Sequence, residues 1–189
     1  MNPVRPRQHV DVYQLKVTLR GSKPPIWRRI QVGSDTTLPK LHRILQATMG
    51  WSNYHLHLFN IEGDDYSEPD PEYGDDMLSE RRVRLGDVID APGFKFIYEY
   101  DFGDSWRHDI LVEDILPPEA GAHYPVCLAG KRACPPEDCG GIWGYAHFLE
   151  AIRDPQHEEH DELVEWIGGS FDPEAFDLDA VNRSLRKIS

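Results

Sequence analysis

FKFIYEYDFGDSWRHDILVED, residues 94–114, contains two runs of alternating apolar and polar side chains on either side of a turn. Successive side chains of a β-strand point to opposite faces of the sheet, so each run predicts a strand with one buried face. Gly103-Asp104-Ser105 between the runs predicts a hairpin with a three-residue loop. The apolar face is made of Phe94, Phe96, Tyr98, Tyr100 and Phe102 in the first run, and of Trp106, His108, Ile110 and Val112 in the second.

The register of this hairpin follows from keeping each face uniform. A three-residue loop opposes Tyr100 with His108, whereas a two-residue loop would oppose aromatic side chains with charged ones. The same register places Glu99 opposite Asp109, and two facing like charges are unfavourable. These carboxylates are either separately solvated or hold a cation or a basic partner between them.

The other segments predict an α+β fold. Alternation predicts strands over residues 12–20, 26–32 and 55–61. Leucines at helical spacing, with Pro39 in the first turn and Gly50 at the end, predict a helix between the second and third strands. This ββα start leads into a mixed, largely antiparallel sheet, similar to a β-grasp arrangement, and C-terminal helices follow.

The chain is expected to form one domain preceded by an N-terminal arm. Residues 1–10 are the expected flexible arm, and residues 11–189 are the expected domain. Within the domain, residues 11–116 are expected to form a core of sheet and helix. Residues 117–189 begin with an irregular connector, rich in Gly and Pro, and continue into the helical tail.

Charge is distributed unevenly along the 189 residues, whose net charge is −13. Residues 1–61 carry a net charge of +7 and the remainder −20. Either the basic third packs beside the acidic remainder, or it keeps a local basic face for an anionic partner. A chain this acidic repels DNA at long range, so nucleic acid is not an expected partner except through such a face in residues 1–61.

The sequence lacks the signals of membrane insertion or export. No apolar run approaches the length of a membrane span, and MNPVRPRQHV lacks the apolar core of a signal peptide. The expected compartment is therefore the cytoplasm, with no membrane partner. An odd number of cysteines, three, also argues against a disulfide framework.

Six polar residues on or near the predicted hairpin form a candidate pocket. Arg28 interrupts an apolar face and is expected to need either a carboxylate partner or a path for its guanidinium to reach solvent. Asp101 and His108 are expected on opposite faces, so they should not form a direct acid–base pair. Packed histidines and structural ion pairs are the alternative to a pocket. The six candidates are Arg28, His57, Glu99, Asp101, His108 and Asp109.

The cysteines are a weak candidate for a metal site. Structural zinc has four nitrogen or sulfur ligands, usually including two cysteines separated by two to four residues. Of Cys127, Cys134 and Cys139, only the last two approach that spacing. No cofactor is therefore expected, and a structural zinc is the alternative.

Four segments in order, PPIWRRIQV (24–32), TLPKLHRILQATMGWSNYHLHLF (37–59), YEYDFGDSWRHDILVED (98–114) and CPPEDCGGIWGY (134–145), resemble one family. It is the plasmid pRi Orf-three-like family, also described as TnpR-like passenger proteins of insertion elements. The resemblance implies a compact α+β domain found on plasmids, mobile elements and many bacterial chromosomes. It carries over no catalytic residue.

The sequence favours a non-enzymatic module that binds a protein or another ligand. The alternative is an enzyme or a nucleic-acid-associated, TnpR-like factor with a polar pocket near the DFGDSW hairpin. An enzyme would bring several of the six candidate side chains into one concavity, and a binding module would not. Aromatic stripes can also stack nucleobases, but five aromatic residues facing Ile110 and Val112 are more typical of core.

Overall fold

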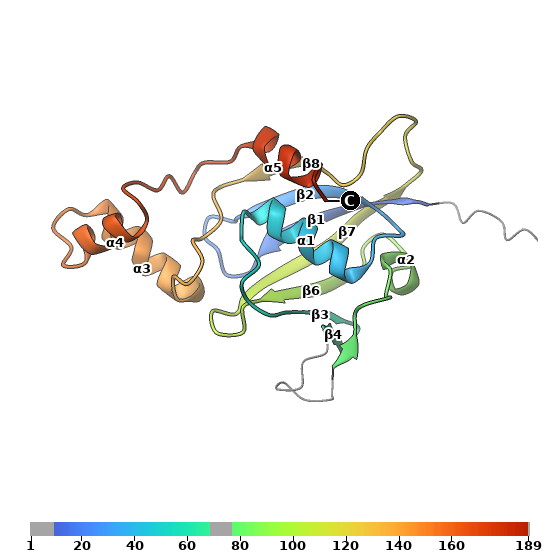
Figure 1. Ribbon diagram of the computed structural model, residues 1–189, viewed down its shortest axis with the longest axis horizontal. Coiled ribbons are helices and arrows are strands. Elements are labelled where there is room, and N and C mark those ends of the chain that lie inside the picture. The colour runs from blue at the N-terminus through green and yellow to red at the C-terminus, as the bar shows by residue number, and fades with distance from the viewer. Residues whose placement is uncertain (1–9, 69–76, 189) are drawn as a thin grey trace, which may run out of the picture.

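The computed structural model describes residues 10–68 and 77–188, and these form an α+β fold around one eight-stranded sheet (Figure 1). The strand order is β5-β4-β3-β6-β7-β1-β2-β8, and each neighbouring pair is antiparallel except β4 with β5. The predicted class and the mixed, largely antiparallel sheet are thus confirmed. The predicted arm, residues 1–10, lies outside the described residues apart from Val10.

The predicted strands and helices occur in the expected order with small differences at their ends, and β8 is an additional strand. The strands are β1 Val12–Leu19, β2 Trp27–Gly33, β3 His57–Ile61, β4 Asp64–Ser67, β5 Leu78–Ser79, β6 Lys95–Tyr100, β7 Trp106–Leu116 and β8 Val126–Lys131. The helices are α1 Leu38–Met49, α2 Leu85–Val88, α3 Gly141–Arg153, α4 His160–Trp166 and α5 Leu178–Leu185. Among the described residues, no helix is long and apolar enough to cross a membrane.

The predicted aromatic stripe is part of the hydrophobic core. Phe96, Tyr98 and Tyr100 of β6 are buried, and they belong to the same cluster as the apolar stripe of α1. That stripe is made of Leu38, Leu41, Ile44, Leu45 and Met49. Burying a large apolar side chain contributes roughly 1.5–3 kcal/mol. The aromatic stripe of β6 therefore stabilises the fold and does not present a surface for base stacking.

The hairpin register differs from the prediction by two residues. Tyr100 pairs with Trp106, so five residues, 101–105, connect the strands instead of three. The turn is longer because Asp101 has a left-handed backbone (φ 58°) and its carboxylate accepts the N–H groups of Gly103 and Asp104. A shift of two keeps each side chain on its predicted face but exchanges its cross-strand partner.

The predicted like-charge pair is therefore wrong. Glu99 faces Arg107, and the two side chains form an ion pair of 2.8 Å. Asp109 faces Ile97 across the hairpin. It forms an ion pair with Arg20, which follows β1, the other strand that pairs with β7. Both carboxylates have a cationic partner, so neither is left for a cation held between them.

The predicted irregular connector contains a strand. β8 pairs with β2 at the edge of the sheet, and a bulge between Arg29 and Ile30 accompanies the pairing. α5 returns from the tail to lie beside β8 and α1, whereas α3 and α4 pack together away from the centre of the sheet (Figure 1). The end of the sheet nearest α3 also holds the turn 101–105 and the loop that follows α1 (Figure 1).

Candidate functional site

Arg28 is buried in β2, and its partners are main-chain oxygens. Its guanidinium donates to the carbonyls of Trp27, Thr48, Lys131 and Arg132 over 2.8–3.0 Å. The ring of Phe176 lies 4.5 Å from the guanidinium carbon, and burial lowers the pKa of Arg28. The prediction of a carboxylate partner is wrong. The acceptors are backbone carbonyls from three separate segments of the chain.

His57 and His108, the two candidate histidines, are both in the core. His57 donates through Nε2 to the carboxylate of Glu80 over 2.9 Å, and its ring stacks on His42 with centroids 3.5 Å apart. The ring nitrogens of His108 form no hydrogen bond of normal geometry, although the backbone of Tyr98 and Trp106 partly offsets the effect of burial on its pKa. Burial lowers the pKa of His108 to about 4, so the ring is neutral near pH 7.

His42 belongs to a buried network that the sequence analysis missed. Its Nε2 donates to the side-chain oxygen of Asn53 over 2.6 Å, so its Nδ1 accepts from the hydroxyl of Tyr98 over 2.8 Å. Gln46 also donates to that hydroxyl and accepts the backbone N–H of Asn53. Burial, with a smaller effect from His57, lowers the pKa of His42 to about 3.

A signal for this network was present in the helix. His42 and Gln46 are four residues apart, on the side of α1 that also carries the buried leucines. Two polar side chains at that spacing on an apolar face require buried partners. The network is closed, because the groups it joins satisfy one another, and it fixes the loop after α1 against β6.

The connector before α3 is docked on the same loop. Tyr100 donates to the carboxylate of Glu137 over 2.6 Å and accepts the backbone N–H of Tyr54. The indole of Trp51 donates to the carbonyl of Pro135 over 3.0 Å. Burial raises the pKa of Tyr100, and this keeps its hydroxyl protonated as a donor. The loop 51–56, the turn 101–105 and the connector 135–140 therefore meet at one end of the sheet.

Asp101 is the candidate that lies at this junction. One of its carboxylate oxygens, Oδ2, is 3.6 Å from Nε2 of His55. The same nitrogen is 3.0 Å from a carboxylate oxygen of Asp138. The ligand atoms of these three residues all lie within 4.8 Å of one another, which makes them a possible metal-binding group. Asp101 bonds the turn and faces His55, and it does not pair with His108.

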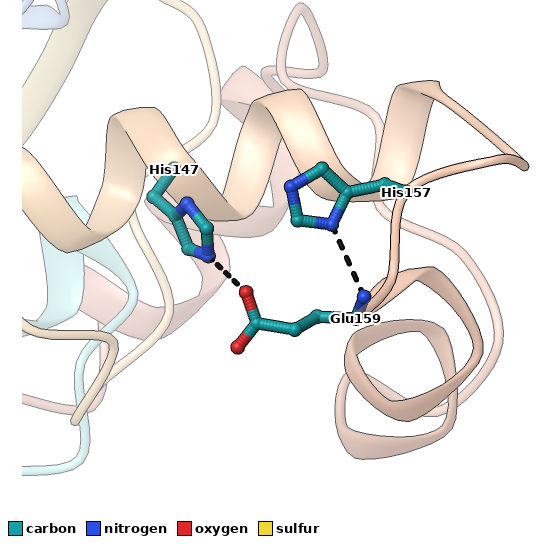
Figure 2. Close-up of side chains that lie close together, drawn as sticks. All are labelled: His147, His157 and Glu159. Atoms are coloured by element: carbon teal, nitrogen blue, oxygen red, sulfur yellow. Dashed lines mark hydrogen bonds and ion pairs between the residues drawn. The ribbon is translucent and has the colours of Figure 1, made fainter.

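A second group of this kind lies on the tail. It contains His147 of α3 with His157 and Glu159 of the following loop. Figure 2 shows the carboxylate of Glu159 directed at the ring of His147, 2.5 Å from Nε2. The backbone N–H of Glu159 donates to Nδ1 of His157 over 3.1 Å (Figure 2).

The three cysteines are free thiols, and neither metal-binding group includes one. Burial raises the pKa of Cys127, of Cys134 and, to about 12, of Cys139.

An apolar groove lies between the residues 21–26 and α3. Its volume is about 380 Å³, and Trp143 stands at its edge with 85% of its surface exposed. The groove is lined by Gly21, Ser22, Lys23, Pro24, Ile26, Arg132, Ile142, Trp143, Tyr145, Ala146 and Leu149. The lining includes two cationic side chains and no carboxylate.

Comparisons with known proteins give a family. Residues 11–180 match the family described as plasmid pRiA4b ORF-3-like protein. The uncharacterised protein y4hQ of Sinorhizobium fredii is 43% identical over 181 residues, which cover 95% of this chain and 93% of that protein. The crystal structure of MM3350, a protein of unknown function from Methanosarcina mazei Go1, has a TM-score of 0.82 and 42% identity. The match covers 91% of this chain and 98% of that one.

Proposed function

The chain belongs to the plasmid pRiA4b ORF-3-like family, and we propose that it is a non-enzymatic module that binds a protein partner in the groove beside α3. The exposure of Trp143 carries this proposal. Trp51 and Trp106 are buried, whereas Trp143 presents its indole to solvent at the edge of an apolar groove. Tryptophan is enriched among the residues that dominate binding energy in interfaces.

The charges of the groove indicate what its partner carries. Arg132 forms an ion pair with Glu174, so Lys23 supplies the cationic charge at the rim. The partner we propose is a peptide segment with one large apolar side chain for the groove and acidic side chains beside it. Complementary charge of this kind sets the choice of partner and the association rate more than the affinity.

The roles of the candidate polar residues support a binding module over an enzyme. Arg28 donates hydrogen bonds to four carbonyls. Glu99 forms an ion pair with Arg107, and Asp109 forms one with Arg20. An enzyme needs side chains that reach a substrate in one concavity. These three instead hold the sheet together.

The proposal places the module in the cytoplasm and includes no zinc bound by cysteine. The three free thiols support the compartment, and among the described residues no group of possible metal ligands includes a cysteine. Disulfides are rare in reducing compartments, and zinc requires the thiolate form.

Selection from a displayed peptide library tests the proposal directly. The native protein should enrich peptides that have an aromatic or aliphatic residue flanked by Asp or Glu. Trp143→Ala should weaken their binding at least tenfold, because it removes the indole that the apolar side chain of the peptide would contact. Lys23→Glu should weaken the binding of the most acidic peptides further, because it reverses the charge at the rim. Fluorescence anisotropy measures each affinity.

Tyr54→Ala is the matched control, because Tyr54 is also an exposed aromatic residue, at 80%, and does not line the groove. It should bind the selected peptides as the parent does. Equal binding by the parent and Trp143→Ala, or a library without enriched peptides, would exclude the groove as the contact surface.

A further inference from the structure

We propose that His55, Asp101 and Asp138 bind one divalent transition-metal ion. The three residues come from the loop after α1, from the turn between β6 and β7, and from the connector before α3. They are distant in sequence and meet at one end of the sheet. The inference rests on their geometry and does not depend on the groove.

The separations between the ligand atoms suit a shared ion. Nitrogen and oxygen ligands lie about 2.0–2.2 Å from zinc, which places neighbouring ligand atoms roughly 3.0–3.5 Å apart. Nε2 of His55 is 3.0 Å from Asp138 and 3.6 Å from Asp101. Since the three ligand atoms lie within 4.8 Å of one another, we infer that side-chain movements of about 1 Å bring them to one ion.

The carboxylate of Asp101 provides an independent reason to expect a cation. The side chain of Asp101 is 11% exposed, and its Oδ1 accepts the N–H groups of Gly103 and Asp104. Its Oδ2 faces His55 at 3.6 Å, which is too long for a hydrogen bond. Burying a carboxylate is costly unless it is paired or coordinates a metal. A cation at the centre of the group satisfies this oxygen.

The ligand set selects the class of ion. Imidazole suits zinc, iron, copper and nickel, while a site for magnesium or calcium is made of oxygen ligands. His55 is 31% exposed and Asp138 69% exposed at the side chain. Solvent can therefore fill the remaining coordination positions.

The group on the tail is a poorer site, although it contains two histidines. Nδ1 of His157 accepts the backbone N–H of Glu159, so Nε2 carries the proton in the neutral ring (Figure 2). A histidine that binds a metal instead donates its second ring N–H to an acceptor. His147 and Glu159 therefore form a histidine–carboxylate contact, and this cluster supplies a matched control.

Metal titration of the full-length protein, stripped with a chelator, tests the site. Calorimetry should show one Zn²⁺ bound per chain and no comparable binding of Mg²⁺. Co²⁺ should give the visible absorption of an ion with protein ligands. Asp138→Asn should lower the affinity for Zn²⁺ at least tenfold, because the neutral amide replaces an anionic ligand.

Asp138→Asn keeps the size of the side chain, and asparagine tolerates the left-handed backbone at this position (φ 59°). Thermal unfolding without metal should match that of the parent, while added Zn²⁺ should raise the unfolding temperature of the parent alone. His147→Gln should bind Zn²⁺ as the parent does.

Three results would overturn the inference. They are no binding of Zn²⁺ or Co²⁺ by the parent, undiminished binding by Asp138→Asn, and loss of binding in His147→Gln instead. Trp143→Ala should retain the metal, so failure of the metal site and failure of the peptide groove are separate outcomes.

Discussion

At the scale of single residues, His108 combines complete burial with two ring nitrogens that form no hydrogen bond of normal geometry. It lies on β7 beside Tyr98 and Trp51, whose rings are 5.4 and 5.3 Å away. Burial favours the neutral ring, and protonation would place an uncompensated charge in the core. The residue therefore couples the stability of the fold to pH.

The sign of this coupling follows from the two pKa values. The pKa of histidine is near 6.5 in the unfolded chain, and burial lowers that of His108 to about 4 in the folded chain. Between these values the unfolded chain binds a proton that the folded chain does not, so the free energy of unfolding falls as pH falls from about 6.5 to 4. Above pH 6.5 the ring is neutral in both states and contributes no pH dependence.

His108→Leu should make the pH dependence of stability less steep, and should leave the contribution of His42, whose pKa burial lowers to about 3. Within that window one proton corresponds to about 1.4 kcal/mol per pH unit, and leucine removes that contribution. Urea unfolding at intervals from pH 4.5 to 7.5 measures the slope for parent and variant. The exposed His123→Leu is the control and should keep the parent's slope. Parallel curves for His108→Leu and the parent would contradict the expected coupling.

Arg28 shows how far single residues can be predicted. An arginine on an apolar strand face predicts a buried partner, and the structure contains one. The partner's identity depends on carbonyls at positions 48, 131 and 132, which the fold brings together from distant segments. The proposed metal site could be predicted only in part for the same reason. The sequence pointed to Asp101 near the turn, but only the fold shows that His55 and Asp138 lie beside it.

At the scale of elements, alternation and helical spacing predicted the strands and α1 well, because each signal is local. The hairpin loop was predicted too short, since a side chain that accepts N–H groups of its own turn can begin that turn early. β8 was missed because residues 126–131, VCLAGK, show no alternation of apolar and polar side chains and lie in a region rich in Gly and Pro. Its strand depends on contacts with β2 and α5 and not on its own pattern.

The contact between α5 and β8 gives a prediction at this scale. The amide of Asn182 accepts the backbone N–H of Cys127 over 2.8 Å and donates to its carbonyl over 2.9 Å. Asn182→Ala should lower the free energy of unfolding by about 2 kcal/mol, since two backbone groups lose their partner. It should also speed hydrogen exchange at the amide of Cys127.

Arg183→Ala is the control on the same helix, because Arg183 is exposed and its ion pair with Asp177 is long, at 3.8 Å. It should change the free energy of unfolding by less than about 1 kcal/mol. If Asn182→Ala leaves both stability and exchange at Cys127 unchanged, then α5 does not hold the edge strand in place.

At the scale of the whole molecule, the strands of the basic N-terminal third lie in the sheet beside β7, which carries three acidic residues. β1 pairs with β7 on one side and β2 on the other. Arg20 and Arg29 form ion pairs with Asp109 and Glu113 of β7. Hydrogen bonding to Arg29 lowers the pKa of Glu113, so this carboxylate stays ionised well into the acidic range. Such pairs support the neutralisation of the basic third by the remainder of the chain.

The native protein should therefore not bind DNA measurably at physiological salt. A net charge of −13 repels phosphates at long range, and Arg20, which follows β1, and Arg29 of β2 are held in ion pairs. Anisotropy of a labelled duplex and of a labelled single strand, at two salt concentrations, measures this. The double variant Asp109→Asn with Glu113→Gln releases Arg20 and Arg29 and should bind more strongly at low salt than the parent. Tight binding by the parent that weakens steeply with salt would show instead a free basic face and would favour a nucleic-acid partner over the peptide.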